Sequence, residues 1–249
     1  MRPLAMITGA TSGIGEACAR KFAAGGYDLI ITARRQERLE ALKRELAEMG
    51  AAVTTLCFDV RDLEATKAAL AGLDGLAIDV LINNAGLALG LEKEYEGDFD
   101  DWNTMIDTNV KGLLTVTRLI VPGMVKRNSG HVINIGSVAG DAAYAGGAVY
   151  CATKAAVKTI TDGLRIDLAE TAVRVTNIKP GLVETNFSVV RFHGDEQRAE
   201  NVYKGIEPLT GADIADVAFY AASAPKHVQI AEVLVLATHQ ASGSVIHRD

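Results

Sequence analysis

The stretch Leu4-Ala5-Met6-Ile7-Thr8-Gly9-Ala10-Thr11-Ser12-Gly13-Ile14-Gly15 decides the fold class of this 249-residue chain. Its apolar start is typical of a buried parallel strand. The glycine-rich turn leads into residues 14–24, which read as a helix closed by Gly25 and Gly26. Glycines at such a turn let the backbone approach a pyrophosphate, and the helix N-terminus adds amide donors. The stretch therefore predicts a dinucleotide site, although glycines can also serve the turn alone.

The rest of the chain continues the alternation of strand and helix. We expect further strands at 28–33, 53–58, 79–82, 131–135, 174–178 and 232–237, and helices at 35–49, 63–73, 101–128 (one or two abutting), 150–169 and from Thr210 to before Pro225. Short connections between such elements favour a parallel sheet with helices on both faces. The prediction is a single α/β domain over 1–249, a Rossmann-type doubly wound sheet. The irregular, charged stretch 185–209 is a candidate substrate lid.

Composition narrows the range of partners. The net charge of −6 and the sequence pI of about 5.4 argue against nucleic acid. No apolar run reaches the roughly 18 residues of a membrane span, and the N-terminus has no separate signal segment. Three widely spaced cysteines are typical of a cytoplasmic chain with reduced thiols. The five histidines lack paired ligand spacing, so no metal is expected.

The end of the second expected strand indicates which dinucleotide binds. An NAD-binding protein usually has an Asp or Glu there, which accepts hydrogen bonds from the ribose hydroxyls. This strand instead ends in Arg34 and Arg35, whose planar guanidinium groups suit a 2′-phosphate. Cations are unfavourable near a helix N-terminus, so an anionic ligand explains their placement better than solvation alone. We therefore predict NADP.

Two further strand ends carry polar candidates. Asp59 with Val60 could bond an adenine amino group, although a helix cap is a nearly equal alternative. Asn84, Ala85 and Gly86 could line the adenosine side of the cleft. Residues of this kind after a buried strand are otherwise simply turn residues.

Four residues predict proton chemistry. Tyr150 and Lys154 lie four positions apart and share one face of a helix. A Lys ammonium beside a phenol lowers the phenol's pKa from its reference of about 10, so that it can pass a proton at neutral pH. Ser137, just past the fifth strand, can donate to a carbonyl oxygen, although a lone Ser there is usually a turn or a cap. Asn109 falls inside an expected helix, where Asn is a poor helix former, which suggests a side-chain or backbone role.

Taken together and in this order, these residues resemble the classical short-chain dehydrogenases/reductases over essentially the whole chain. The matching pieces are Thr-Gly-x3-Gly-x-Gly at 8–15, Asn-Asn-Ala-Gly at 83–86, Asn109, Ser137, Tyr-x3-Lys at 150–154, and Pro180-Gly181 with Thr185. The resemblance implies that the protein is typically a cytoplasmic homotetramer or homodimer, and we expect a homotetramer.

The same resemblance implies roles for individual residues. Tyr150 would donate or accept the proton, Lys154 would lower its pKa and hold the nicotinamide ribose, and Ser137 would orient the carbonyl. Asn109 would anchor a water that links Lys154 to solvent, and Thr185 would contact the carboxamide. The implied cofactor-binding residues are Gly9, Thr11, Ser12, Gly13, Ile14, Gly15, Arg34, Arg35, Asp59, Val60, Asn84, Ala85, Gly86, Tyr150, Lys154, Pro180, Gly181, Val183 and Thr185.

Segments 34–39, 84–90, 144–147 and 190–195 are similar to the bacterial NADP-dependent 3-hydroxy acid dehydrogenases, a group that sulfoacetaldehyde reductases also resemble. This similarity implies a short substrate with an anionic end. Arg191 in the candidate lid could bind that end by paired bonds, and Tyr144 could add a hydroxyl donor. The alternative is that Arg191 is a surface residue or pairs with Asp195. His239 or Gln240 could complete the pocket, even from another subunit.

The expected function is therefore NADP-dependent interconversion of a small 3-hydroxy acid and its 3-oxo acid or semialdehyde, with Ser137, Tyr144, Tyr150 and Arg191 binding the substrate. One alternative is a sulfoacetaldehyde reductase that forms isethionate. A second is a non-catalytic NADP-binding sensor.

Overall fold

The computed structural model describes residues 2–73 and 75–249, and it contains one sheet of seven parallel strands. The strands are β1 (Leu4–Thr8), β2 (Asp28–Ala33), β3 (Val53–Cys57), β4 (Val80–Asn83), β5 (Gly130–Ile135), β6 (Val173–Pro180) and β9 (Glu232–Val235), in the order β3-β2-β1-β4-β5-β6-β9. The strand order reverses between β1 and β4, which is where doubly wound sheets bind their ligands. The expected fold class is confirmed.

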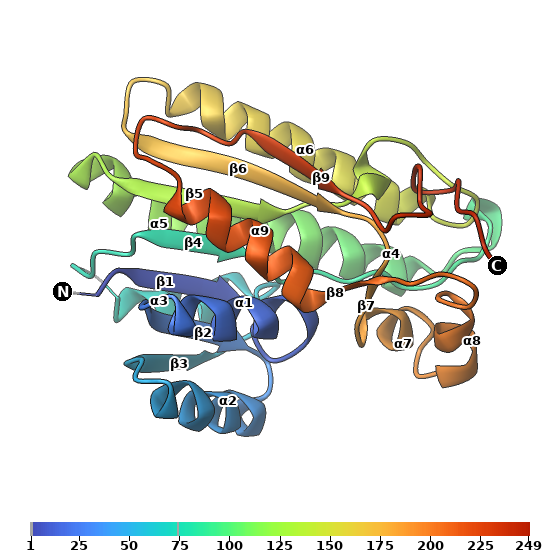
Figure 1. Cartoon of the computed structure of the whole chain (residues 1–249), viewed down its shortest axis with the longest axis horizontal. Coiled ribbons are helices and arrows are strands. Elements are labelled where there is room, and N and C mark those ends of the chain that lie inside the picture. Colours follow the sequence, from blue (N-terminus) through green and yellow to red (C-terminus); the bar gives the residue numbers. More distant parts are fainter. Residues whose placement is uncertain (1, 74) are drawn as a thin grey trace.

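Helices cover both faces of the sheet (Figure 1). The helices between and after the strands are α1 (Gly13–Ala24), α2 (Gln36–Glu48), α3 (Leu63–Ala71), α4 (Phe99–Ile106), α5 (Leu113–Arg127), α6 (Ala148–Asp167) and α9 (Gly211–Ser223). Alternate strand residues enter two cores. Ile7 and Ile82 join the core under α1 and α9, whereas Met6 and Leu81 join the core under α3 and α5. Burial on both faces explains why the strands read as continuous apolar runs.

The expected helix at 101–128 is two α-helices joined by a π-helical turn, Asp107–Gly112. The candidate lid is partly regular: it holds α7 (Phe187–Arg191) and α8 (Glu196–Asn201), and β7 (Val183–Glu184) before it pairs with β8 (Leu209–Thr210). Within the described residues no helix has the length and apolar character that a bilayer crossing needs.

A buried polar row crosses the sheet, against the apolar pattern. Asn83, Asn134 and Asn177 are register partners on β4, β5 and β6. The Asn83 amide donates to the Asn134 side-chain oxygen at 2.9 Å and to Thr117 at 3.0 Å. These bonds tie β4 to β5 and to α5.

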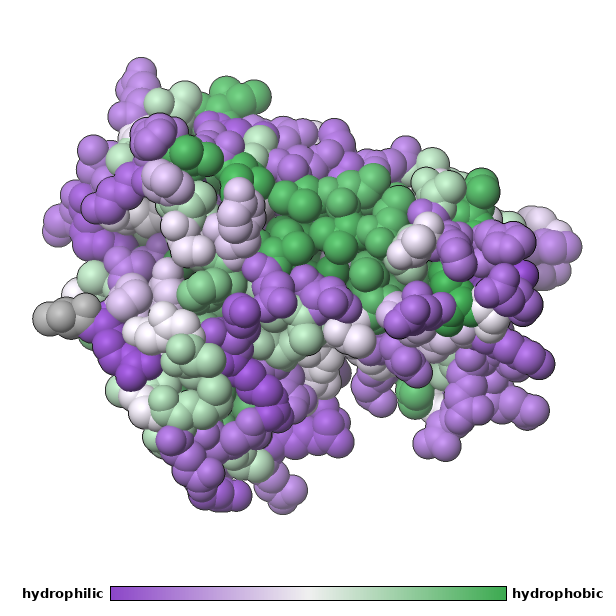
Figure 2. Space-filling view, in the orientation of Figure 1, coloured by the Kyte–Doolittle hydropathy of each residue, from purple (hydrophilic) through white to green (hydrophobic). Residues whose placement is uncertain are grey.

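The strand β9 ends the sheet and has no second neighbour among the described strands. Its Leu234 side chain is exposed. Figure 2 shows apolar atoms gathered on this face of the molecule, where β9 runs beside α9.

Candidate functional site

Ser137, Tyr150 and Lys154 lie together at the carboxyl edge of the sheet. Ser137 follows β5, and Tyr150 and Lys154 lie one turn apart on α6. All three are at least nine-tenths buried. The Lys154 ammonium donates to the Ile135 carbonyl at 2.8 Å and lies 6.0 Å from the centre of the Tyr150 ring. The arrangement places a phenol, a hydroxyl and an ammonium around one point that is shielded from water.

The electrostatics of this group differ from the expectation. Burial, followed by the neighbouring Tyr144, raises the pKa of Tyr150, and hydrogen bonding to Ser137 and the charge of Arg191 offset only part of that rise. Burial also lowers the pKa of Lys154 to about 8. The expected net lowering of the Tyr150 pKa is therefore wrong for the polypeptide itself, because the loss of solvent outweighs the nearby cations.

Asn109 lies in the π-helical turn and is buried. Its side chain pairs with both backbone groups of Leu87, accepting from the amide at 2.9 Å and donating to the carbonyl at 2.8 Å. It also donates to Thr153 on α6 at 3.0 Å. A helix side chain therefore joins the segment after β4 to the helix of Tyr150 and Lys154. The water-anchoring role of Asn109 stays a prediction.

The glycine-rich turn is shaped for a close approach. Gly9 and Gly13 adopt φ of +65° and +54°, a region that L side chains rarely enter. A Cβ at Gly9 would lie 2.9 Å from the Cα of Ala85, and one at Gly15 would overlap the Gly9 carbonyl. A Cβ at Gly13 would lie 3.1 Å from the side chain of Thr185. The turn thus meets the segment after β4 on one side and the start of the lid on the other.

The remaining residues of the turn lie beside Gly9, Gly13 and Gly15, which together form a cradle. Ser12 precedes α1 without capping it through its side chain, which leaves the hydroxyl for a ligand. Thr11 is buried and Ile14 is half-buried against the core of the α1 face.

Asn84 and Ala85 hold the end of β4 against the turn. The Asn84 side-chain amide donates to the carbonyls of Thr8 and Gly9 at 3.0 and 3.1 Å. The backbone amides of Asn84 and Ala85 each donate to the Thr8 hydroxyl at 3.0 Å. A Cβ at Gly86 would lie 3.2 Å from the Asn109 side-chain oxygen and 3.6 Å from the Lys154 ammonium. The predicted cofactor segment 84–86 therefore reaches the catalytic group.

An arginine cluster marks the end of β2. Burial, followed by the charges of Arg38 and Arg34, lowers the pKa of Arg35. Arg38 was not anticipated from the sequence, although its position one turn into α2 could have indicated it. Three cations that disfavour one another in this way fit an anionic ligand.

Asp59 at the end of β3 offsets part of the positive charge of the arginine cluster. Burial alone would raise the pKa of Asp59, but hydrogen bonds from Arg61 and the charge of Arg34 lower it. Arg61 donates to both carboxylate oxygens, and Arg34 lies 3.9 Å away. Val60 packs against Gly112. The adenine contact of Asp59 stays a prediction.

The end of β6 leads into the lid. The Gly181 amide donates to Val235 at 2.7 Å after Pro180 ends the strand, and Val183 is buried in the core of the α1 face. Gln240 does not line the pocket around Tyr150. It is buried and accepts from the Leu182 amide at 2.8 Å, so it holds the loop, while His239 is exposed. Neither residue lines the pocket around Tyr150 in this chain, and their contribution, from this or another subunit, stays a prediction.

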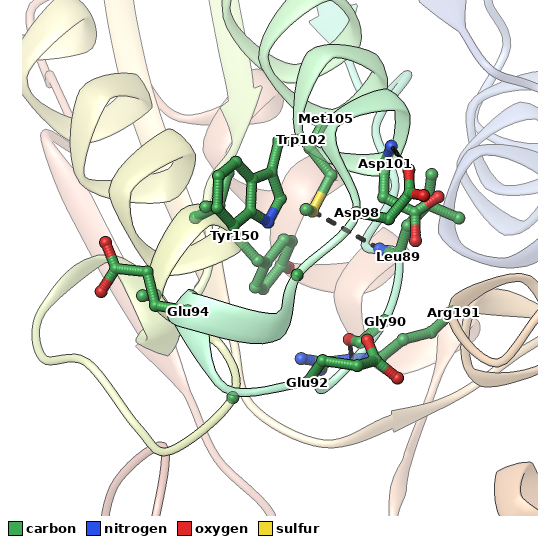
Figure 3. Close-up of a pocket in the computed structure, with 14 residues that line it drawn as sticks. Leu89, Gly90, Glu92, Glu94, Asp98, Asp101, Trp102, Met105, Tyr150 and Arg191 are labelled. Carbon is green, nitrogen blue, oxygen red and sulfur yellow. Dashed lines mark hydrogen bonds between the residues drawn. The ribbon is translucent and has the colours of Figure 1, made fainter.

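A pocket opens beside Tyr150 and Arg191 (Figure 3). Trp102 and Met105 of α4 form an apolar wall, and Glu92 and Asp101 contribute carboxylates. None of these four was identified from the sequence, because a lone Trp or Glu on an unremarkable segment gives no signal. Among the described residues, no group of three or more metal-ligating side chains is placed to hold an ion.

Arg191 has one uncommitted guanidinium nitrogen. Its Nε donates to the Gly90 carbonyl at 3.2 Å and one terminal nitrogen donates to the Tyr144 hydroxyl at 3.0 Å. The other terminal nitrogen is buried and has no hydrogen-bond partner in the described part of the chain. The guanidinium carbon lies 5.7 Å from the Tyr150 ring centre. Asp195 instead caps α8, so the alternative pairing with Arg191 is not formed.

Comparisons with known proteins agree with this geometry. The family model for short chain dehydrogenases matches residues 3–196. The NADP-dependent 3-hydroxy acid dehydrogenase YdfG of Salmonella typhi is 50% identical, over 98% of this chain and 99% of its own. The serine 3-dehydrogenase of Rhizobium radiobacter is 47% identical over 98% of each chain.

Solved structures give the same result. The closed form of a serine dehydrogenase complexed with NADP+ superposes with a TM-score of 0.92 at 47% identity, covering 99% of this chain and 100% of that one. The Escherichia coli serine dehydrogenase has a TM-score of 0.80 at 44% identity, covering 93% and 96%. The chain therefore belongs to the short chain dehydrogenase family.

Proposed function

We propose that this protein is an NADP-dependent oxidoreductase that interconverts a small 3-hydroxy acid and its 3-oxo acid or semialdehyde. One observation carries the proposal: a buried Arg191 guanidinium nitrogen, without a partner among the described residues, shares a pocket with the phenol of Tyr150. A proton-transfer group beside an anion-binding group suits a short hydroxy acid. The relatives named as 3-hydroxy acid and serine dehydrogenases support the same substrate class.

The residues around the glycine-rich turn fit the cofactor. The cradle at Gly9, Gly13 and Gly15 leaves no room for a Cβ, which suits the close approach of a pyrophosphate. Arg34, Arg35 and Arg38 provide the cations for a 2′-phosphate. The relatives' names and the NADP+ complex of the serine dehydrogenase support NADP over NAD. When bound, NADP supplies or accepts the hydride.

The protein's own part is the handling of the proton and the charge. Tyr150 Oη gives a proton to the carbonyl oxygen in reduction and takes it from the alcohol in oxidation. Ser137 donates a hydrogen bond to the same oxygen, and the ammonium of Lys154 favours the phenolate as it forms. Burial of all three excludes water and strengthens these interactions.

Arg191 selects the acid end of the substrate. Its free nitrogen and the Tyr144 hydroxyl can donate to one carboxylate, and charge-assisted bonds of this kind are the strong ones. A guanidinium would also accept a sulfonate, but none of the relatives named above is a sulfoacetaldehyde reductase. The intact Ser137, Tyr150 and Lys154 group disfavours a non-catalytic sensor.

The proposal extends to the organisation of the molecule. Strands from residue 4 to residue 235 share one sheet, which supports a single domain over 1–249 with 185–209 as a substrate lid. The exposed edge of β9 supports a homotetramer. We place the enzyme and its small anionic substrate in the cytoplasm, as the family resemblance implies.

The test is oxidation of a panel of 3-hydroxy acids, with serine among them, using NADP+ and NAD+ in parallel. We expect turnover with NADP+ and little with NAD+. Tyr150→Phe should remove most turnover and leave NADPH binding nearly unchanged. Full activity of this variant would exclude the proton role of Tyr150, and a preference for NAD+ would exclude the role of the arginine cluster.

A second comparison tests the substrate class. We expect Arg191→Ala to raise KM for acidic substrates roughly 10- to 100-fold, the size of one charged hydrogen bond. KM for a neutral short-chain aldehyde should change little. Arg198→Ala is the matched control, because Arg198 lies in the lid and stacks on Phe192 outside the pocket. An equal loss on acidic and neutral substrates would contradict the assignment of Arg191.

A further inference from the structure

The segment that carries Arg191 is held to the rest of the molecule by two separate contacts. Arg191 exchanges hydrogen bonds with Gly90: the Gly90 amide donates to the Arg191 carbonyl at 2.9 Å, and Arg191 Nε donates back to the Gly90 carbonyl at 3.2 Å. Two residues later, His193 Nε2 lies 2.9 Å from the Asp101 carboxylate on α4. The second contact lies outside the proton-transfer group and has no part in the function proposed above.

We propose that His193 and Asp101 form a positioning pair, which holds the C-terminal end of α7 so that Arg191 presents its free nitrogen to the substrate's acid group. The inference rests on the proposed function, because it assigns the pair a role in binding the same anionic substrate. His193 lies outside the pocket, whereas Asp101 lines it, so His193→Gln is the variant that tests positioning apart from a change in the pocket lining.

The backbone at this point is the C-terminal cap of α7, where the Gly194 amide donates to the Val189 carbonyl at 2.9 Å and the His193 amide to the Val190 carbonyl at 3.1 Å. His193 has φ of +52°, and Gly194 follows with φ of +93°. A non-glycine residue in the left-handed region is uncommon and is retained where surrounding contacts hold it. The side-chain bond to Asp101 is the contact that His193 makes across to α4. Without that bond, we expect residues 192–194 to relax and the Gly90 contact to loosen with them.

Carboxylates surround the pair on several elements. Asp101 is largely buried, at 16% side-chain exposure, and the Glu92 carboxylate approaches Gly90 from the same side. Asp98 begins α4, and on the lid side Asp195 caps α8. Arg191 is the cation that faces this group, and its Nε is committed to Gly90. The surroundings are therefore predominantly negative.

The experiment compares His193→Gln, Asp101→Asn and the double variant with wild type, and uses His227→Gln as the control at an exposed histidine outside the lid. Each protein is assayed at one fixed pH with NADP+ on a 3-hydroxy acid and on a neutral short-chain alcohol. For His193→Gln we expect a rise of about threefold to fivefold in KM for the acid, as for a partly exposed polar pair. His193 lies outside the pocket, so we expect kcat and KM for the neutral alcohol to change little in this variant.

Two readouts separate positioning from a general loss of structure. The double variant should be no worse than either single one, because both remove the same interaction. His227→Gln should leave KM for the acid at its wild-type value. Unchanged KM in His193→Gln, or equal losses on the acid and the neutral alcohol, would overturn the proposal.

Hydrogen exchange of residues 187–194 provides a measurement that does not depend on turnover. We expect these amides to exchange faster in His193→Gln and Asp101→Asn than in wild type. If the wild-type protein oxidises no 3-hydroxy acid, the proposed function fails while this comparison still decides whether the pair holds the segment. Equal exchange in all three proteins would refute the positioning role.

Discussion

At the scale of single residues, Lys154 is the group of the proton-transfer site whose charge changes near neutral pH. Burial lowers the pKa of Lys154 to about 8, whereas burial raises the pKa of Tyr150 well above that range. A sequence argument that assigns the neutral-pH ionisation to the phenol overlooks the desolvation that both groups share. The pH dependence of turnover should therefore report the ammonium.

We expect kcat/KM for carbonyl reduction to fall as the pH rises above about 8, because neutral Lys154 no longer stabilises the phenolate that Tyr150 becomes. Lys154→Met should lower kcat at pH 7 at least about 100-fold and remove this limb of the profile. The check is a kcat/KM profile from pH 6 to 10. Lys158→Met is the control, because Lys158 lies one turn further on α6 and pairs with Asp162 near the surface. If kcat/KM of Lys154→Met still falls above about pH 8, the fall belongs to another ionisable group.

At the scale of helices and strands, features that depend on local sequence could be predicted, and features that depend on distant contacts could not. Gly9 and Gly13 were predictable because their backbone conformation and the strand before them are local properties. The parallel sheet with helices on both faces followed from short connections between alternating strands and helices. His193 and Asp101 are 92 positions apart, and nothing local to either residue indicates that they meet. The π-helical turn at Asn109 was missed for a related reason: the bonds of Asn109 to Leu87 and Thr153 are tertiary, and helix propensity does not record them.

Strands β5 and β6 carry a buried histidine that should limit stability in acid. His131 Nε2 lies 2.8 Å from the Thr176 hydroxyl, and its Nδ1 has no hydrogen-bond partner among the described residues. Burial, followed by the charge of Arg174, lowers the pKa of His131 from 6.5 to about 3. Between these two values the unfolded chain binds a proton that the folded chain does not. Acidification therefore favours unfolding, and this contribution is absent above about pH 6.5.

We expect the free energy of unfolding to fall by about 1.4 kcal/mol per pH unit between pH 6 and 4 on account of this one residue. Urea unfolding of wild type and His131→Val at pH 7, 6, 5 and 4 measures it, with His227→Val as the exposed control. The slope should be smaller by that amount in His131→Val alone. Parallel slopes in all three proteins would show that His131 is not the group that titrates.

At the scale of the whole molecule, one edge of the sheet gathers everything that the function needs. The glycine-rich turn, Ser137 and the start of the lid follow β1, β5 and β6, and the carboxyl ends of parallel strands meet at one edge. The lateral edge of the sheet has a different requirement. Strand β9 lies at this edge, and proteins usually cover or protect an unpaired edge strand. The exposed Leu234 and the apolar area in Figure 2 make this edge the place where a second copy of the chain would pack.

We expect Leu234→Lys to weaken assembly, because a charge on that edge must lose its water when a second chain covers it. Light scattering after size exclusion should give the mass of a homotetramer for wild type and a smaller species for Leu234→Lys at micromolar concentration. Leu76→Lys is the matched control, since both leucines are 47% exposed and Leu76 lies away from the edge strand. NADPH binding by each variant checks that it is folded. A wild-type monomer would make the homotetramer wrong, and a tetramer that tolerates Leu234→Lys would move the interface to another face.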